Sequence, residues 1–571
     1  MRATSVSYRV AAAVLAVSVV FSADALAQTV AQRKALLEQV LEATAKIPPA
    51  QKKLLSSGAQ NFLNVAQKLN TTYVKNGDDG GLINAAASPV PALQANVAGA
   101  ELSPGFGGPT PISNPALDFQ TSVIAGFTQS ETSTAWCGNS VVSAYNDSGA
   151  YLRTFGVNPA GAISFNSASY SVNGGRTFRA LPFLNPGTDP TNFLEGDPVV
   201  TCTSPSQFYY TSLFFTSPNP NVFPFGVSAV SISSSSTGGA SWGAPVIAAS
   251  KDGGSHFLDK PWSAVDPTNP NRLYVTYTDF DFSFTSAACP NDIRLAIELV
   301  ASADGGQTWS APIVIDEECS ASLKSVQGSN VIVSPTGAVY VAWEFFLPGA
   351  VNEIHFTKSL DNAKTFGAVV KVNTQVVPNG GLGALQGLFR VNEFPAMAVD
   401  RANGTIYITW SDGRNNVTQD VIAGTYAYPD VFVAKSMDLG QTFSAPKAVS
   451  PAPAGFAGKG RDQFFPGIAV DRDGHVGVCY YDRRNDPANT VIDRYCSVSL
   501  DHGASWFELR ASNSNWLPIH FSDDLLGPTY MGDYDALASD FLGTSAGFLG
   551  SFEILNKGNP DVFAKKFGSF D

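Results

Sequence analysis

Apolar and polar residues alternate in short segments along most of the chain from residue 117 onward. Residues 272–279, for example, read Arg-Leu-Tyr-Val-Thr-Tyr-Thr-Asp. A period of two predicts β-strands with one buried face, and the Asp-Gly, Asn-Gly and Asn-Pro turns between them predict antiparallel hairpins. Similar pairs of segments recur at 395–412 and 466–482, so we expect one hairpin unit to be repeated along the chain.

The first hundred residues follow a different pattern. Apolar residues between 30 and 70 are spaced as on a helix, and Pro48 and Pro49 divide them, so we expect two short helices in an extension over residues 28–75. These helices pack against the main domain in the simplest interpretation, and binding or anchoring to a partner is the alternative. Residues 76–116 are rich in Gly, Pro and Ala, which is typical of a linker.

The amino terminus has the features of a secretory signal peptide. Arg2 and Arg9 flank the start of an apolar run over residues 10–21, and residues 25–27 read Ala-Leu-Ala. We therefore predict a signal peptide over residues 1–27, cleavage after Ala27, and a secreted or periplasmic protein. The apolar run is too short to span a membrane, and no other stretch reaches 18 apolar residues.

The six cysteines are an even number, which in an exported chain indicates disulfides, with buried free thiols as the alternative. Cys479 and Cys496 lie on neighbouring predicted strands and are the best candidate pair. The chain has no Cys-x-x-Cys motif and its five histidines are scattered, which argues against a zinc site.

A motif of the form Ser-x-Asp-x-Gly-x-Thr/Ser-Trp/Phe occurs six times, with starts 57 to 77 residues apart. An Asp in a turn accepts hydrogen bonds from backbone N–H groups, Gly permits a positive φ, and the aromatic residue fills the space between sheets. Regular recurrence predicts a repeat architecture. The third position of the motif is occupied by Asn173, Thr237, Asp304, Asp361, Asp438 and Asp501.

With these motifs the chain resembles the Asp-box (bacterial neuraminidase repeat) proteins of the sialidase-like superfamily. The resemblance implies a β-propeller of four-stranded antiparallel blades over residues 117–571, with each box between the third and fourth strands of a blade. In the boxes at 235 and 359, Thr237 replaces Asp and Ala363 replaces Gly, and we expect looser turns there with the register kept.

The number of blades follows from counting the units. A seventh unit after the last box has three strands and then the chain ends. A fourth strand from the amino-terminal side, for which residues 119–125 are suitable, would close the ring and remove its open edges. We therefore favour seven blades, with six as the alternative.

Composition and charge narrow the class of function. Charged residues make up 15% of the chain, against roughly 25% in an ordinary soluble domain, and Gly is abundant at 51 residues. This composition suits many strands and tight turns and argues against a coiled coil or a helical bundle. The formal net charge of −13 makes a nucleic-acid partner improbable. Removal of the signal peptide makes the charge one unit more negative.

The predicted topology brings many charged residues to one rim of the ring. Residues just before first strands and just after second strands share the face opposite the boxes, and this rim is our candidate site. Before first strands lie Glu195, Asp197, Asp259, Lys260, Arg390, Glu393, Arg461, Asp462, Asp533 and Tyr534. After second strands lie Asp147, Asp279, Glu344, Asp412, Arg414, Asp482, Arg483, Arg484 and Glu553.

The sialidase resemblance implies three substrate-binding arginines, a Tyr nucleophile with a Glu partner, and an Asp acid/base. The candidate arginines are Arg390, Arg461 and one of Arg414, Arg483 or Arg484, with Asp412, Asp482 and Asp533 as further substrate-binding candidates. The catalytic candidates are Tyr530 or Tyr534 as nucleophile, Glu393 as partner, and Asp197 or Asp259 as acid.

No catalytic residue of the family can be transferred by motif, because its Phe/Tyr-Arg-x-Pro segment is missing before the first box. Two hypotheses therefore stand. The first is a secreted exo-acting glycoside hydrolase for sialic acid or another sugar. The second is a non-catalytic propeller that binds glycans or proteins, which a rim of paired arginines would favour. We expect no cofactor; calcium at the acidic rim is a weaker idea that no EF-hand-like loop supports.

Overall fold

The computed structural model describes most of the chain from residue 101 onward. The predicted signal peptide, the predicted helices and most of the predicted linker therefore lie outside the described residues. The described ranges are 101–102, 108–120, 125–157, 162–189, 191–216, 226–347, 351–376, 381–385, 389–415, 417–420, 424–449, 461–518, 523, 526, 530–556 and 559–568.

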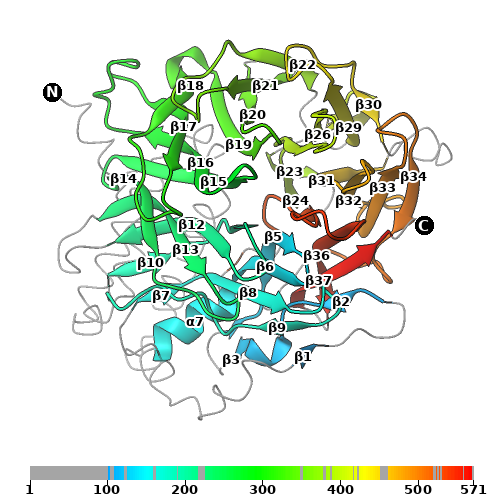
Figure 1. Cartoon of the computed structure of the whole chain (residues 1–571). Coiled ribbons are helices and arrows are strands. Elements are labelled where there is room, and N and C mark those ends of the chain that lie inside the picture. The colour runs from blue at the N-terminus through cyan, green and yellow to red at the C-terminus, as the bar shows by residue number, and fades with distance from the viewer. Residues whose placement is uncertain are drawn as a thin grey trace.

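The chain forms a β-propeller of seven blades, as predicted, arranged around a central channel (Figure 1). The strands of each blade are given from the channel outward. Blade 1 consists of β5 (Gln129–Cys137), β6 (Ser140–Asp147), β8 (Asn166–Ser171) and β9 (Phe178–Ala180), and blade 2 consists of β11 (Val199–Cys202), β12 (Phe208–Thr216), β13 (Val227–Ser235) and β14 (Val246–Asp252). Blade 3 consists of β15 (His256–Asp266), β16 (Asn269–Asp281), β17 (Arg294–Ser302) and β18 (Ile313–Cys319), and blade 4 consists of β19 (Ser325–Val333), β20 (Val339–Phe346), β21 (Asn352–Ser359) and β22 (Val370–Val376).

Blades 5 to 7 are β25 (Ala396–Val399), β26 (Ile406–Asp412), β29 (Asp430–Ser436) and β30 (Lys447–Ala448); β31 (Gln463–Val470), β32 (Val476–Asp482), β33 (Asp493–Ser499) and β34 (Phe507–Arg510); β35 (Leu537–Ser539), β36 (Phe548–Asn556), β37 (Asn559–Phe567) and β2 (Thr110–Pro111). Smaller elements are β1 (Glu101–Leu102), η2 (Pro115–Leu117), β3 (Phe119–Gln120), β4 (Ala125–Gly126), α7 (Ser148–Val157), β7 (Ile163–Ser164), β10 (Asn192–Leu194), η3 (Ser320–Ser322), β23 (Gly381–Leu385), β24 (Phe389–Val391), β27 (Val417–Asp420) and β28 (Gly424–Ala427). Among the described helices, none is long and apolar enough to cross a membrane.

The ring is closed from the amino-terminal side, but the predicted segment was wrong. β2, a part of the predicted linker, pairs with β37 as the outer strand of blade 7. Part of the segment predicted for this role, residues 119–120, instead pairs with β4. Side chains reinforce the closure between blades 7 and 1, since the Thr132 hydroxyl donates to Asp535 over 2.8 Å. Backbone pairing and side-chain hydrogen bonds thus hold the ring closed together, so an outer strand of two residues is sufficient for the closure.

The box turns share one hydrogen-bond pattern. In the box at 302–309, Asp304 Oδ1 accepts from the backbone N–H of Gln307 and of Thr308, and the Ser302 hydroxyl donates to Asp304 Oδ1. The two departures keep this geometry: Thr237 Oγ1 accepts from Ser241 N over 2.9 Å, and Ala363 adopts a φ of 62°. The expected loosening is therefore absent from the hydrogen bonds of these two turns.

All six cysteines form disulfides, and the predicted pair Cys479–Cys496 joins two adjacent strands of blade 6. Cys137–Cys202 joins blades 1 and 2, and Cys289–Cys319 joins the loop between β16 and β17 to the end of β18 in blade 3. The hydrophobic core lies between neighbouring blades. Between blades 4 and 5, for example, Phe356 packs in one cluster with Trp410, and both are fully buried.

Candidate functional site

Several inner strands begin with a β-bulge, and a residue of positive φ lies at this point. The register breaks after Ser130 in β5, after Asp259 in β15, after Gln327 in β19 and after Phe464 in β31. A bulge turns a side chain away from its regular direction, and it is common beside functional sites. Residues of positive φ at the start of inner strands are Glu131, Asp197, Lys260, Gly328, Phe465 and Gly532.

Three of these bulge residues, with Asp533, form a buried ionic cluster at the predicted rim. Lys260 Nζ lies 2.6 Å from Asp533 Oδ2, 3.2 Å from Asp197 Oδ1 and 3.4 Å from Glu131 Oε1. All four side chains are at most 4% exposed. Blades 1, 2, 3 and 7 each contribute one of them, so the cluster depends on the closed ring.

Two further side chains orient Glu131. The Tyr530 hydroxyl donates to Glu131 Oε1 over 3.2 Å, and Asn146 Nδ2 donates to Oε2 over 3.0 Å. Gly532 has a φ of 78°, and a Cβ atom there would lie 2.2 Å from Glu131 Cγ. Only glycine at this position leaves room for the Glu131 side chain. We call Glu131, Asp197, Lys260, Tyr530 and Asp533 the rim cluster.

The surroundings of Glu131 in the rim cluster keep its carboxyl group protonated. Burial raises the pKa of Glu131 to about 8; Lys260 opposes this rise, and Asp197 and Asp533 add to it. Burial also raises the pKa of Asp197, again against the effect of Lys260. Burial by itself would lower the pKa of Lys260, but Asp197, Asp533 and Glu131 hold it well above its usual value. At neutral pH, Glu131 is therefore a protonated acid beside a positively charged lysine.

The hydroxyl of Tyr530 stays protonated, because burial raises its pKa well above the usual value. Tyr534, the other predicted nucleophile, donates its hydroxyl to the backbone oxygen of Pro198 over 3.1 Å. Its ring packs against Trp262, and Lys260 Nζ lies 5.4 Å from the ring centre. Tyr530 therefore contacts the rim cluster through its hydroxyl, whereas Tyr534 contacts it through its ring.

The remaining predicted catalytic residues lie on the same rim but outside the rim cluster. Asp259 accepts a hydrogen bond from Gln327 Nε2 over 2.9 Å. Glu393 is buried beside Glu344, and the pKa of Glu344 is well above its usual value because of burial and the charge of Glu393. Glu131, rather than the predicted Glu393, is thus the glutamate at the Tyr530 hydroxyl.

The predicted arginine cluster is largely replaced by ion pairs within blades. Arg414 pairs with Asp412. Arg484 pairs with Asp482, and also with Glu508 over 2.6 Å. Arg461 is buried, and the side chain of Arg390 lies outside the described residues. Two of the candidate arginines, Arg414 and Arg484, are therefore held by carboxylates of their own blades.

Arg483 and Asp462 form the most deeply buried of these pairs, with Nη1 2.8 Å from Oδ2 and both side chains fully buried. Removing one partner leaves a buried charge uncompensated, so we expect Arg483→Met to destabilise the protein by about 3–5 kcal/mol. The double variant Arg483→Met/Asp462→Leu should recover much of this loss. Urea unfolding of the three proteins measures it; equal stability of Arg483→Met and the wild type would contradict a structural role for the pair.

A group of metal-type ligands, Asp471, Asp473 and His475, lies within the part of the chain that the structure describes. It occupies the turn after β31, at the opposite end of the blade from the rim cluster. Asp471 already accepts hydrogen bonds from the backbone N–H groups of Asp473, His475 and Gly547. Because the carboxylate oxygens of Asp471 already accept these backbone hydrogen bonds, the group gives no support for a metal centre.

The sequence pattern missed several rim residues. Glu131 was not predicted because β5 itself was not recognised as a first strand. Arg494, in β33, is fully buried 3.6 Å from Asp535, with Glu553 nearby. Residues 130–134 read Ser-Glu-Thr-Ser-Thr, a polar run without the alternation of the other first strands, so the sequence carried no signal for Glu131.

Comparisons with known proteins found no matching family model and no curated relative. Solved structures with a similar arrangement include the Hadza microbial sialidase Hz136, at 16% identity over 71% of this chain and 74% of that one, with a TM-score of 0.40. An α-L-arabinanase of Penicillium chrysogenum has 12% identity over 65% and 92% of the two chains, with a TM-score of 0.41. The GH93 α-L-arabinofuranosidase of Fusarium graminearum has 14% identity over 67% and 96%, with a TM-score of 0.38. At these values, the likeness transfers neither a substrate nor a catalytic residue to this chain.

Proposed function

We propose that the protein is an exported glycoside hydrolase that acts on terminal sugars and uses the rim cluster as its catalytic centre. The observation that carries the proposal is that two carboxyl groups lie beside the same ammonium nitrogen. Lys260 Nζ is 3.4 Å from Glu131 Oε1 and 3.2 Å from Asp197 Oδ1. Glycoside hydrolysis uses two carboxyl groups at least about 5 Å apart, one protonated and one ionised. Glu131 and Asp197 share a hydrogen bond, so the proposal requires the two side chains to separate when a sugar binds.

The environment assigns a role to each residue. Glu131 is protonated at neutral pH and donates its proton to the leaving oxygen. Asp197 acts as the carboxylate, and Lys260 stabilises its charge with the ammonium group and with the backbone N–H, which lies 3.2 Å from Oδ2. Tyr530 has a raised pKa, which makes it a poor nucleophile. Its role is instead to position Glu131 through the hydrogen bond from its hydroxyl. The mechanism therefore differs from the one that the sialidase resemblance implies.

The charge balance of the rim favours a sugar without a carboxylate. Binding of an anionic sugar depends on arginines with free bidentate faces, whereas Arg414 and Arg484 are engaged by neighbouring carboxylates. The rim cluster has three carboxyl groups for one ammonium. An anionic ligand would be repelled there, so a neutral sugar is the substrate class we propose.

The direct test is a release assay with aryl glycosides of neutral pentoses and hexoses, together with aryl sialosides. We expect hydrolysis of at least one neutral glycoside and none of the sialosides. Preferential release of sialic acid would refute the neutral substrate class. The paired rim arginines also fit a non-catalytic propeller that binds glycans, and binding without hydrolysis across the whole panel would favour that function.

The pH profile gives an independent prediction. Glu131 must carry a proton to act as an acid, and it loses this proton as the pH rises through about 8. We therefore expect kcat/KM to fall about tenfold per pH unit above this value. Rates measured from pH 5 to 10 check it, with circular dichroism as the control for folding. A kcat/KM that stays level up to pH 10 in the folded protein would contradict the role of Glu131.

A further inference from the structure

The rim cluster borders a cavity that runs along the central channel. The cavity has a volume of about 300 Å³, and all seven inner strands contribute to its wall. Lys260, Asp533 and Tyr534 lie at its rim end, and Phe541 lies toward the box end. This volume is at the lower limit of the range for small-molecule pockets. The cavity therefore reaches the rim cluster at Lys260 and Asp533, and it is large enough for a compact ligand.

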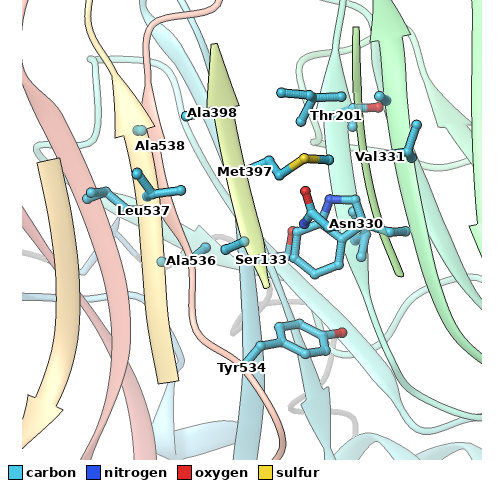
Figure 2. A pocket seen from close by; sticks show the side chains of 18 of the residues that line it. Ser133, Thr201, Asn330, Val331, Met397, Ala398, Tyr534, Ala536, Leu537 and Ala538 are labelled. Atoms are coloured by element: carbon cyan, nitrogen blue, oxygen red, sulfur yellow. The ribbon is translucent and has the colours of Figure 1, made fainter. Parts of the chain in front are cut away.

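The wall of the cavity is mainly apolar. Figure 2 shows Val331, Met397, Ala398, Leu537 and Ala538 among its lining side chains, with Met397 and Asn330 next to each other in its middle part. Small and branched aliphatic side chains offer few hydrogen bonds to the hydroxyl groups of a sugar. Such a surface instead gains free energy by contact with apolar groups.

A few polar atoms in the wall lack partners. Asn330 is 3% exposed, and its Oδ1 atom is buried without a hydrogen bond. The hydroxyl of Ser329, one residue before it, is also buried without a partner. A buried polar atom without a partner costs free energy, but these two atoms have almost no accessible surface, so they do not face a ligand in the cavity. An apolar wall with few convergent polar groups is typical of a small-molecule site.

We propose that this cavity is the subsite for the aglycone of the substrate, and that the aglycone is a compact aromatic or short alkyl group. This assignment rests on the proposed glycosidase function. The sugar ring lies at the rim cluster, and the group to which it is attached extends along the channel past Asn330 and Met397. The protein then releases sugar from small apolar glycosides rather than from polysaccharides.

The experiment has a binding arm and a kinetic arm. In the binding arm, 2-naphthol is titrated into the wild type and into Met397→Trp, which fills the middle of the cavity. Isothermal titration calorimetry measures the affinity, and Trp136 and Trp262 in the wall offer a fluorescence signal. We expect Met397→Trp to weaken binding at least about tenfold. The matched control is Met437→Trp, at an exposed box position, which should bind as the wild type does.

In the kinetic arm, kcat/KM is compared for a naphthyl glycoside and for the same sugar linked to a second sugar. Met397→Trp should lower the naphthyl value, whereas Met437→Trp should leave both values at the wild-type level. If this variant does not fold, Ala398→Leu narrows the same cavity. Equal naphthol affinity in the wild type and the cavity variant overturns the subsite. Naphthol binding without hydrolysis of any glycoside instead refutes the proposed function, and with it the aglycone role, while the apolar site remains.

Discussion

Glu131→Gln should reduce the hydrolysis rate of the best neutral glycoside by about 10²–10⁴-fold, the usual contribution of a general acid. Glutamine has nearly the same shape and can still accept a hydrogen bond from Tyr530 and from Lys260, which now contact Oε1 of Glu131. It cannot transfer a proton to the leaving oxygen. We therefore expect kcat to fall while the unfolding midpoint changes little, since one buried carboxyl is replaced by a neutral amide.

The steady-state rate with an aryl glycoside measures this effect, and two comparisons make it specific. The control is Glu353→Gln, which changes a buried glutamate on β21 in blade 4 and should leave kcat at the wild-type level. The residual rate of Glu131→Gln should also lose its decline above pH 8, because the group that titrates is gone. A wild-type kcat in folded Glu131→Gln would place the catalytic acid elsewhere on the rim.

The repeat was predictable because its signals are local. Each box combines a turn acid, a turn glycine and an aromatic within eight residues, so one blade turn can be recognised without its neighbours. The closing strand is different, because β2 contains two residues, Thr110 and Pro111, and pairs with β37 about 450 residues away. No periodic pattern exists in two residues, and the alternation at 119–125 was a stronger but misleading signal.

The candidate site was predictable as a rim but not as a set of contacts. Topology placed Asp197, Lys260 and Asp533 on one face, and the structure joins them. The contact between Tyr530 and Glu131 spans 399 positions in sequence. Moreover, Glu131 points to the cluster because of a positive φ, which is uncommon for glutamate and is imposed by the bulge. Neither feature is encoded in local composition.

The pairing of arginines was equally beyond the sequence. Asp412 and Arg414 are two positions apart in the sequence. This spacing is compatible with an Arg414 that binds substrate and equally with an Arg414 that forms an ion pair with Asp412. Only the position of the guanidinium, whose Nε lies 2.8 Å from Asp412 Oδ2, distinguishes them. Under the proposed function, this difference favours a neutral sugar over sialic acid as the substrate.

Lys260→Met should lower the free energy of unfolding at neutral pH by about 3–5 kcal/mol, because it leaves several buried carboxyls without their common counter-charge. Methionine matches the length of the lysine stem, so packing is largely preserved. Lys371→Met is the matched control: it changes a lysine whose side chain is 56% exposed and paired with Glu353. A surface pair of this kind contributes at most about 1 kcal/mol.

The pH dependence identifies the cause of this loss. Burial raises the pKa of Glu131 and Asp197 above their unfolded values, so each destabilises the fold as the pH rises and it ionises. Removing Lys260 raises them further, so the folded variant binds more protons than the folded wild type, and its deficit should shrink as the pH falls from 8 toward about 5. Urea unfolding at both pH values measures the difference. A deficit that is the same at both pH values would mean that lost packing, rather than uncompensated charge, destabilises Lys260→Met. The rim cluster would then not be the electrostatic unit on which the proposed catalysis depends.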